Sequence, residues 1–261
     1  MARKPPAAPS GNGIADRLAP FQVAAADAAV DLTAFDPAAK PFSLGAKARD
    51  REAVDALAVE LDALQNLFYA DRRHKLLVVL QGIDTSGKDG TLRGVFGRMS
   101  PLGIVTVGWQ APSMVERAHD HLWRIHQRVP GSGEIVVFNR SHYEDVLVPV
   151  VNRTIDAAET RRRYAQINDF ERLQDRVDDP AKRWKFKRED LDVRKQWDAY
   201  QAAYAAAIGT TGTPWAPWTV VPADSKTHRN LMIATALKQT LEGLGLRYPQ
   251  DDPTLAGLRV E

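Results

Sequence analysis

The eight residues from Gly82 to Asp89, GIDTSGKD, fit the Walker A pattern G-x-x-x-x-G-K and lie between an apolar segment and a helical pattern. Glycines let the backbone fold around an anion, the N–H groups of the turn and of the next helix point at its oxygens, and the lysine adds a positive charge. The alternative is an ordinary strand–turn–helix connection. The position between strand and helix favours a phosphate-binding loop, in which Lys88 is catalytic. The residues predicted to bind phosphate in this loop are Gly82, Thr85, Ser86, Gly87, Lys88, Asp89 and Gly90.

Two acidic residues of this loop are unusual for a site that binds phosphate. Asp89 stands where Ser or Thr normally follows the lysine, so the usual magnesium-binding hydroxyl is absent. Asp84 adds a carboxylate inside the loop, where an unpaired negative charge would repel phosphate. A bridging Mg²⁺ ion removes this repulsion, because magnesium binds carboxylates together with substrate phosphates. We therefore predict Mg²⁺ between the substrate and Asp84, which is a metal ligand and a catalytic residue.

A second polar run follows the third apolar strand pattern and begins with Asn139 and Arg140. Polar groups at the carboxyl end of a parallel strand lie beside the phosphate loop in an open α/β sheet. Arg140 is therefore predicted to be a catalytic, phosphate-contacting cation beside the transferring phosphoryl group. Its alternative role is a surface ion pair with Glu144 or Asp145. Packing or hydrogen bonding, and not catalysis, is expected of the two following aromatic residues, His142 and Tyr143.

Positive charge is concentrated at residues 161–195, which we call the lid region. This range holds 12 Lys or Arg against 8 Asp or Glu, whereas the whole chain has 35 basic and 33 acidic residues. Such a mixed run is usually a solvated linker. Near a phosphate loop it can also be a closing lid that delivers Lys and Arg to a polyanion. Both interpretations are open at this point.

Alternating strand and helix patterns surround these residues. Apolar spacing from Val54 to Phe68 predicts a helix, and the run from Lys75 to Gly82 is typical of a central parallel strand buried on both faces. Further patterns predict strands at 103–109, 134–138 and 218–221 and helices near 92–99, 113–125, 193–208 and 229–244. Ser113 and Glu116 form a capping box. The alternation indicates an α/β fold with right-handed βαβ units and a parallel sheet.

Length and composition limit the class of protein. The chain has 261 residues, of which 44% are hydrophobic and 26% charged, as in an ordinary globular protein. It has no cysteine, which excludes disulfides, thiolate nucleophiles and Cys-based metal sites. No apolar run approaches the roughly 20 residues of a membrane span, and a net charge of +2 does not suggest coating of nucleic acid. We expect a flexible tail at 1–13, a single domain at 14–261, a cytoplasmic location, and neither nucleic acid nor membrane as partner.

These motifs resemble those of the type 2 polyphosphate kinase family. The loop from Gly82 to Asp89 matches the family pattern G-x-D-x-x-G-K-D, and FNRSHYEDVLV at 138–148 matches a second family segment. The similarity continues through HDHLWRIH, RYAQINDFE, DPAKRWKF and APWTVVPADSK, so it covers most of residues 40–245. The segment FNRSHYEDVL is similar to the corresponding segment in the branch of the family that acts on both AMP and ADP.

The resemblance implies a P-loop kinase-like α/β fold, a three-layer sandwich with a parallel sheet and a helical lid. It implies a transferase that moves phosphoryl groups between inorganic polyphosphate and adenine or guanine nucleotides with Mg²⁺, and that assembles as a homo-oligomer. Asp84 would help to hold magnesium, while Lys88 and Arg140 would contact the phosphates. The lid residues implied in phosphate binding are Arg176, Lys182, Arg183 and Lys185.

One departure from the family concerns the segment after Arg172, which here runs directly into Leu173. Family members carry a further apolar strand and helix start at this place. The sequence alone points the same way, because no convincing strand pattern occurs between Phe138 and Trp218. We therefore expect a sheet that lacks one family strand after Arg172. Two other functions stay open: an ATP-dependent nucleoside monophosphate-type kinase, and a non-catalytic protein that binds polyanions or nucleotides.

Overall fold

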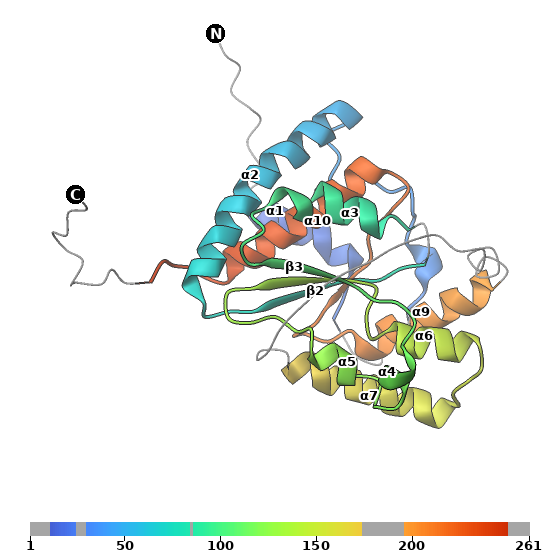
Figure 1. Ribbon diagram of the computed structural model, residues 1–261. Coiled ribbons are helices and arrows are strands. Elements are labelled where there is room, and N and C mark those ends of the chain that lie inside the picture. Colours follow the sequence, from blue (N-terminus) through green and yellow to red (C-terminus); the bar gives the residue numbers. More distant parts are fainter. Residues whose placement is uncertain (1–10, 25–29, 84–85, 174–195, 250–261) are drawn as a thin grey trace, which may run out of the picture.

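The computed structural model describes residues 11–24, 30–83, 86–173 and 196–249. At its centre is a parallel sheet with the strand order β2–β4–β3, formed by β2 (Leu76–Leu80), β3 (Ile104–Gly108) and β4 (Ile135–Asn139) (Figure 1). Leu80 and Gly108 both lie opposite Asn139, so the three strands end in register. Their carboxyl ends therefore form one edge, which is the edge where the sequence places the phosphate loop.

Helices cover both faces of this sheet, which gives three layers (Figure 1). One face is covered by α1 (Gly11–Leu18), α2 (Lys47–Asp71), α3 (Lys88–Gly94) and α10 (Lys226–Gly243). The other is covered by α5 (Trp123–His126), α6 (Glu144–Val151), α7 (Ala157–Leu173) and α9 (Trp197–Thr211). Side chains of β4 alternate between the faces, Ile135 and Val137 on the first, Val136 and Phe138 on the second, and all four are fully buried. The predicted α/β architecture with a parallel sheet is confirmed.

The position of β2 corrects one prediction. The run LLVVL predicts a central strand buried on both faces, but among the described strands β2 pairs only with β4, and its five residues are half-buried. The central position belongs to β4. A strand rich in Val and Leu that has only one neighbouring strand is expected in a sheet that lacks one strand. The absence of a family strand after Arg172 stays a prediction, because residues 174–195 lie outside the described ranges.

A small second sheet and the start of the first helix differ from the predictions. β1 (Gln22–Val23) pairs antiparallel with β5 (Trp218–Thr219), and two-residue strands are too short to show a pattern in the sequence. Helix α1 begins at Gly11, inside the predicted tail at 1–13. The reason is the pair Ile14 and Leu18, one helical turn apart and buried against the core.

Most predicted helices are present with different ends. Both α2 and α10 are longer than their patterns indicate, and the helix predicted at 92–99 is α3 followed by a 3₁₀ turn at Phe96–Arg98. The capping box forms: Glu116 N donates to Ser113 Oγ at 3.2 Å, and Ser113 N donates to Glu116 Oε2 at 2.6 Å. The helix predicted at 113–125 is nevertheless split into α4 (Met114–Arg117) and α5. Asp120 Oδ1 accepts from the N–H of Leu122 at 2.9 Å, and this local turn competes with the helix. The other short 3₁₀ turns lie at Ala19–Phe21 and Leu32–Ala34.

The first residues of the lid region belong to a helix that is packed in the core. Residues 161–173 belong to α7, whose Tyr164, Ile167 and Phe170 are buried among α5, α6 and α9. The first third of the predicted lid is therefore part of the core, because its apolar residues follow helical spacing. The remaining residues, 174–195, lie outside the described ranges. None of the helices in the described ranges has the length and apolar character needed to cross a membrane.

Candidate functional site

The loop predicted to bind phosphate joins β2 to α3. Gly87 is the last residue before the helix and has a φ of 94°, a left-handed conformation that favours glycine. At the other end, Gly82 leaves room for Ser86, since a Cβ on Gly82 would lie 2.8 Å from Ser86 Oγ. The local structure therefore favours glycine at Gly87 through its backbone conformation, and a side chain at Gly82 would displace that of Ser86. Asp84 and Thr85 lie outside the described residues.

Lys88 begins α3 and folds its side chain back over the loop. Its Nζ donates to the carbonyl oxygens of Gly82 (2.7 Å) and Ile83 (2.9 Å), and lies 3.2 Å from Ser86 Oγ. Burial lowers the pKa of this ammonium to about 8, and nearby carboxylates, Glu144 first, oppose the shift. The loop thus carries a fixed and partly desolvated positive charge, the type of group that binds phosphate oxygens.

This low pKa makes anion binding by the loop sensitive to pH. Ligand-free Lys88 loses its proton as the pH rises through about 8, so affinity for inorganic tripolyphosphate should fall by up to about tenfold per pH unit above that value. In Lys88→Arg the cation stays charged, and this fall should vanish. Calorimetric titrations of both proteins across this range measure the difference. Identical pH profiles would contradict a lowered pKa at Lys88.

The lowered pKa of Lys88 also makes the free energy of unfolding depend on pH. The folded-state pKa of Lys88 lies below that of an unfolded lysine, so the unfolded chain binds more protons between these two values. The contribution of Lys88 to the free energy of unfolding therefore rises as the pH rises from about 8.

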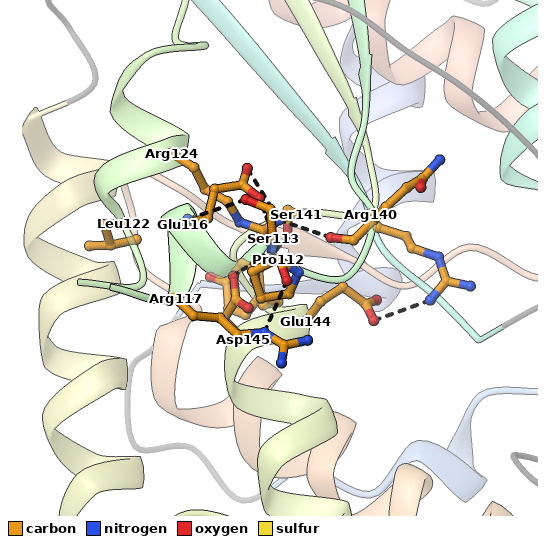
Figure 2. Close-up of polar contacts among 12 residues, drawn as sticks. Pro112, Ser113, Glu116, Arg117, Leu122, Arg124, Arg140, Ser141, Glu144 and Asp145 are labelled. Atoms are coloured by element: carbon orange, nitrogen blue, oxygen red, sulfur yellow. Dashed lines mark hydrogen bonds and ion pairs between the residues drawn. The ribbon is translucent and has the colours of Figure 1, made fainter. Parts of the chain in front are cut away.

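Asn139 and Arg140, at the carboxyl end of β4, lie beside the loop as predicted. Asn139 Nδ2 donates to Asp89 Oδ1 at 2.6 Å, which connects the strand end to the first turn of α3. Arg140 has a φ of 64°, which is uncommon for a residue other than glycine, and its Nη1 lies 3.1 Å from Glu144 Oε2 (Figure 2). The ion pair considered as the alternative role of Arg140 is therefore present. The Arg140 side chain is still 31% exposed, so an anion can reach it.

Glu144 is the carboxylate that connects the two predicted cations. Besides Arg140 it accepts a hydrogen bond from Gln81 Nε2 at 2.6 Å, and its charge acts on Lys88. Gln81 is fixed in turn by Ser141, whose Oγ donates to Gln81 Oε1 at 3.1 Å. Glu144 thus forms an ion pair with Arg140, and its negative charge favours the protonated form of Lys88.

A buried ion pair holds the segment after β3 against α6. Arg124 is 7% exposed, and it donates to Asp145 Oδ2 at 2.9 Å and to the carbonyl oxygen of Gln110 at 2.8 Å (Figure 2). Burial raises the pKa of the Asp145 carboxyl, and the Arg124 guanidinium opposes that shift. A cavity of about 330 Å³ is lined by Arg124 together with Trp109 and Trp123.

His142 and Tyr143 pack and form hydrogen bonds, as expected, and both are fully buried. Tyr143 Oη donates to Glu171 Oε1 at 2.8 Å and lies 2.8 Å from Thr211 Oγ1, while His142 Nε2 lies 3.3 Å from the same Glu171 oxygen. Burial raises the pKa of the Tyr143 hydroxyl well above its usual value. These contacts fix the end of β4 to α7 and α9, and through it the position of Arg140.

Two described residues, at the ends of the loop and of β4, carry oxygen atoms that could contribute to the predicted magnesium site. Asp89 and Asn139, joined by their hydrogen bond, carry carboxylate and amide oxygens of the kind that Mg²⁺ prefers. Across the described ranges, no three or more His, Cys, Asp or Glu side chains gather closely enough to hold a metal ion. The predicted ligand Asp84 lies outside those ranges. The metal site therefore stays a prediction that the neighbouring residues fit.

The structure describes only part of the predicted site. It brings together, at one edge of the sheet, the residues Gly82, Ser86, Gly87, Lys88, Asp89, Gly90 and Arg140. The predicted residues that lie outside the described ranges are Asp84, Thr85, Arg176, Lys182, Arg183 and Lys185. Sequence reasoning missed Gln81, Arg124 and Arg229. A polar residue at the end of a strand was a usable signal for Gln81, whereas the partners of Arg124 and Arg229 lie far away in the sequence.

Comparison with known proteins adds a family and several relatives. A family model described as polyphosphate kinase 2 matches residues 45–173 and 169–247. The two matches meet at 169–173, where the sequence predicts a missing family segment. The crystal structure of polyphosphate kinase 2 from Arthrobacter aurescens TC1 is similar with a TM-score of 0.80 and 37% identity, over 88% of this chain and 94% of that chain.

Two curated relatives are similar over nearly their whole length. The AMP/ADP-polyphosphate phosphotransferase of Meiothermus ruber is 42% identical, over 90% of this chain and 97% of the relative. The ADP-polyphosphate phosphotransferase of Rhodopseudomonas palustris is 32% identical, over 86% and 90%. The first alignment spans 259 positions but covers only 90% of the 261 residues here. The relative therefore has residues without a counterpart in this chain.

Proposed function

Because the chain belongs to the polyphosphate kinase 2 family, we propose that it transfers phosphoryl groups between inorganic polyphosphate and nucleotides, forming ADP from AMP and ATP from ADP. The observation that carries the proposal is the loop from Gly82 to Asp89, with Gly87 in a left-handed conformation before the helix and the Lys88 ammonium folded over it. The name of the Meiothermus ruber relative supports both AMP and ADP as acceptors. Guanine nucleotides are a further predicted substrate.

Lys88 and Arg140 are proposed to bind the reacting phosphates. Lys88 exchanges its bonds to the carbonyl oxygens of Gly82 and Ile83 for bonds to phosphate oxygens, because hydrogen bonds between two charged groups are stronger. Arg140 shares its guanidinium between Glu144 and the phosphoryl group in transfer. Its charge stabilises the negative charge on the equatorial oxygens of that group.

The magnesium ion and the lid complete the proposal. Asp84 would hold Mg²⁺, for which Asp89 and Asn139 carry further oxygen atoms of the preferred kind, and the ion would neutralise phosphate charge and orient the phosphate chain. The lid residues proposed to close over polyphosphate are Arg176, Lys182, Arg183 and Lys185. Helix α7, which leads into this segment, is packed in the core and provides it with a fixed base. The three layers and the TM-score of 0.80 support a P-loop kinase-like fold. A single domain at 14–261, a homo-oligomer and a cytoplasmic location stay predictions.

The test is turnover followed by ³¹P NMR on protein of verified intact mass. With polyphosphate, magnesium and AMP or ADP, the signals of ADP and ATP should appear at a rate that depends on polyphosphate chain length. Turnover of AMP with ATP and without polyphosphate would favour the ATP-dependent kinase instead. Binding without turnover would favour the non-catalytic alternative.

A further inference from the structure

A buried guanidinium lies directly behind the phosphate loop. Arg229, in the first turn of α10, is 5% exposed. A Cβ added to Gly87 would lie 1.9 Å from Arg229 Nη1, and one added to Gly90 would lie 2.8 Å from Nη2. The guanidinium therefore packs on the bare backbone at the end of the loop and in the first turn of α3. Neither glycine can gain a side chain without displacing it.

The hydrogen bonds of Arg229 fix this position but do not neutralise its charge. Its Nε donates to Thr91 Oγ1 at 2.9 Å, and Nη2 lies 3.3 Å from Asn230 Oδ1. Both partners are neutral, and within the described ranges Arg229 forms no ion pair with a carboxylate. Asn230 is held in the same way, because a Cβ on Gly94 would lie 2.0 Å from its Nδ2. Gly87 before α3, together with Gly90 and Gly94 within it, thus forms the groove that receives Arg229 and Asn230.

Among the described residues, no opposite charge offsets the buried guanidinium, so this arrangement is electrostatically unfavourable unless an anion binds. Burying a cation without an opposite charge costs free energy, and burial lowers the pKa of the Arg229 guanidinium. A positive charge in the first turn of a helix also opposes the helix dipole. A polyanion bound on the other side of the loop would offset both costs, since charges interact strongly through a poorly hydrated region.

We infer that Arg229 is a positioning residue for the phosphate loop, which holds the backbone of Gly87 and Gly90 and places a buried positive charge behind the bound phosphate chain. The inference rests on the proposed function, because the anion is the polyphosphate substrate. Arg229 touches the loop and not the reacting atoms, so it acts on the affinity for the phosphate chain and only weakly on the chemical step.

Removal of the guanidinium tests this role. In Arg229→Ala, the Kd for tripolyphosphate and the KM for polyphosphate should rise about tenfold, whereas kcat should change less than about threefold. Guanidinium chloride at low millimolar concentration should restore much of the lost affinity. Urea at the same concentration should not, because it has a similar planar shape but no charge. Restoration by urea to the same degree would overturn the inference, since packing alone would then explain the loss.

Matched variants keep the test decisive. Arg98→Ala removes an exposed arginine that pairs with Asp55, and it should bind tripolyphosphate like the wild type. If Arg229→Ala does not fold, Arg229→Lys and Arg229→Met replace it. The affinity of the lysine variant for tripolyphosphate should be at least about fivefold higher than that of the methionine variant. Equal affinities of these two variants, or an unchanged Kd in folded Arg229→Ala, would overturn the inference.

Calorimetric binding of tripolyphosphate separates this inference from the proposed function, because it does not need turnover. A wild type that binds with the expected dependence on Arg229 but transfers no phosphoryl group would refute the proposed function alone. A wild type that binds no tripolyphosphate would refute both.

Discussion

Turnover with polyphosphate should fall by roughly two to three orders of magnitude when Lys88 is replaced by alanine. The ammonium is the positive charge that the structure places on the loop itself, where its Nζ lies within 3.2 Å of three loop oxygens. Alanine at this position leaves those oxygens to face the phosphate oxygens without a cation between them. The measurement is the initial rate of ADP formation from AMP at saturating polyphosphate and magnesium.

The control for this variant is Lys47→Ala, which removes an exposed lysine at the start of α2. Its rate should equal that of the wild type, which shows that loss of one positive charge from the surface is not sufficient. Circular dichroism verifies that Lys88→Ala keeps the fold. Wild-type turnover in folded Lys88→Ala would refute the loop as the site of phosphoryl transfer.

Gly87→Ala should strongly reduce both stability and phosphate binding. Its φ of 94° is strained for alanine by about 1–2 kcal/mol, and the new Cβ would lie 1.9 Å from Arg229 Nη1 and 2.7 Å from Cζ. Either the buried guanidinium or the loop must move. We expect a loss of roughly 2–4 kcal/mol in the free energy of unfolding and a loss of tripolyphosphate binding of about a hundredfold.

Gly243→Ala is the matched control for Gly87→Ala. A Cβ there meets no heavy atom within 4 Å, and Gly243 is the last residue of α10. This variant should be neutral or up to about 1 kcal/mol more stable, because alanine favours the helix. Urea denaturation gives both free energies of unfolding. Equal stability and equal binding of the two variants would contradict the close contact between Gly87 and Arg229.

Local patterns were sufficient for the elements that depend on close neighbours in the sequence. The phosphate loop, the three parallel strands and the capping box at Ser113 each follow from a few adjacent residues. The position of a strand within the sheet does not, because LLVVL has the same pattern whether one or two neighbours are present. This is why β2 was wrongly expected to be central, whereas β4 is.

Contacts between distant residues could not be read from the sequence. Phe42 N donates to His228 Nε2 at 3.0 Å across 186 residues, and Arg229 bonds Thr91 across 138. The antiparallel pair of β1 and β5 likewise has no local signal. The same limit applies within the site: the glycines of the loop were recognisable, but the residue that fills the space behind them was not.

The backbone conformation of Arg140 lowers stability at a position where the side chain is proposed to be needed for activity. A φ of 64° costs arginine about 1–2 kcal/mol of backbone strain that glycine would not have, and the ion pair with Glu144 offsets part of this cost. Under the proposed function, glycine at this position would also delete a cation that contacts the transferred group. A substitution that relaxes this backbone strain therefore removes a functional charge, so selection for thermal stability alone favours proteins with reduced activity at this position.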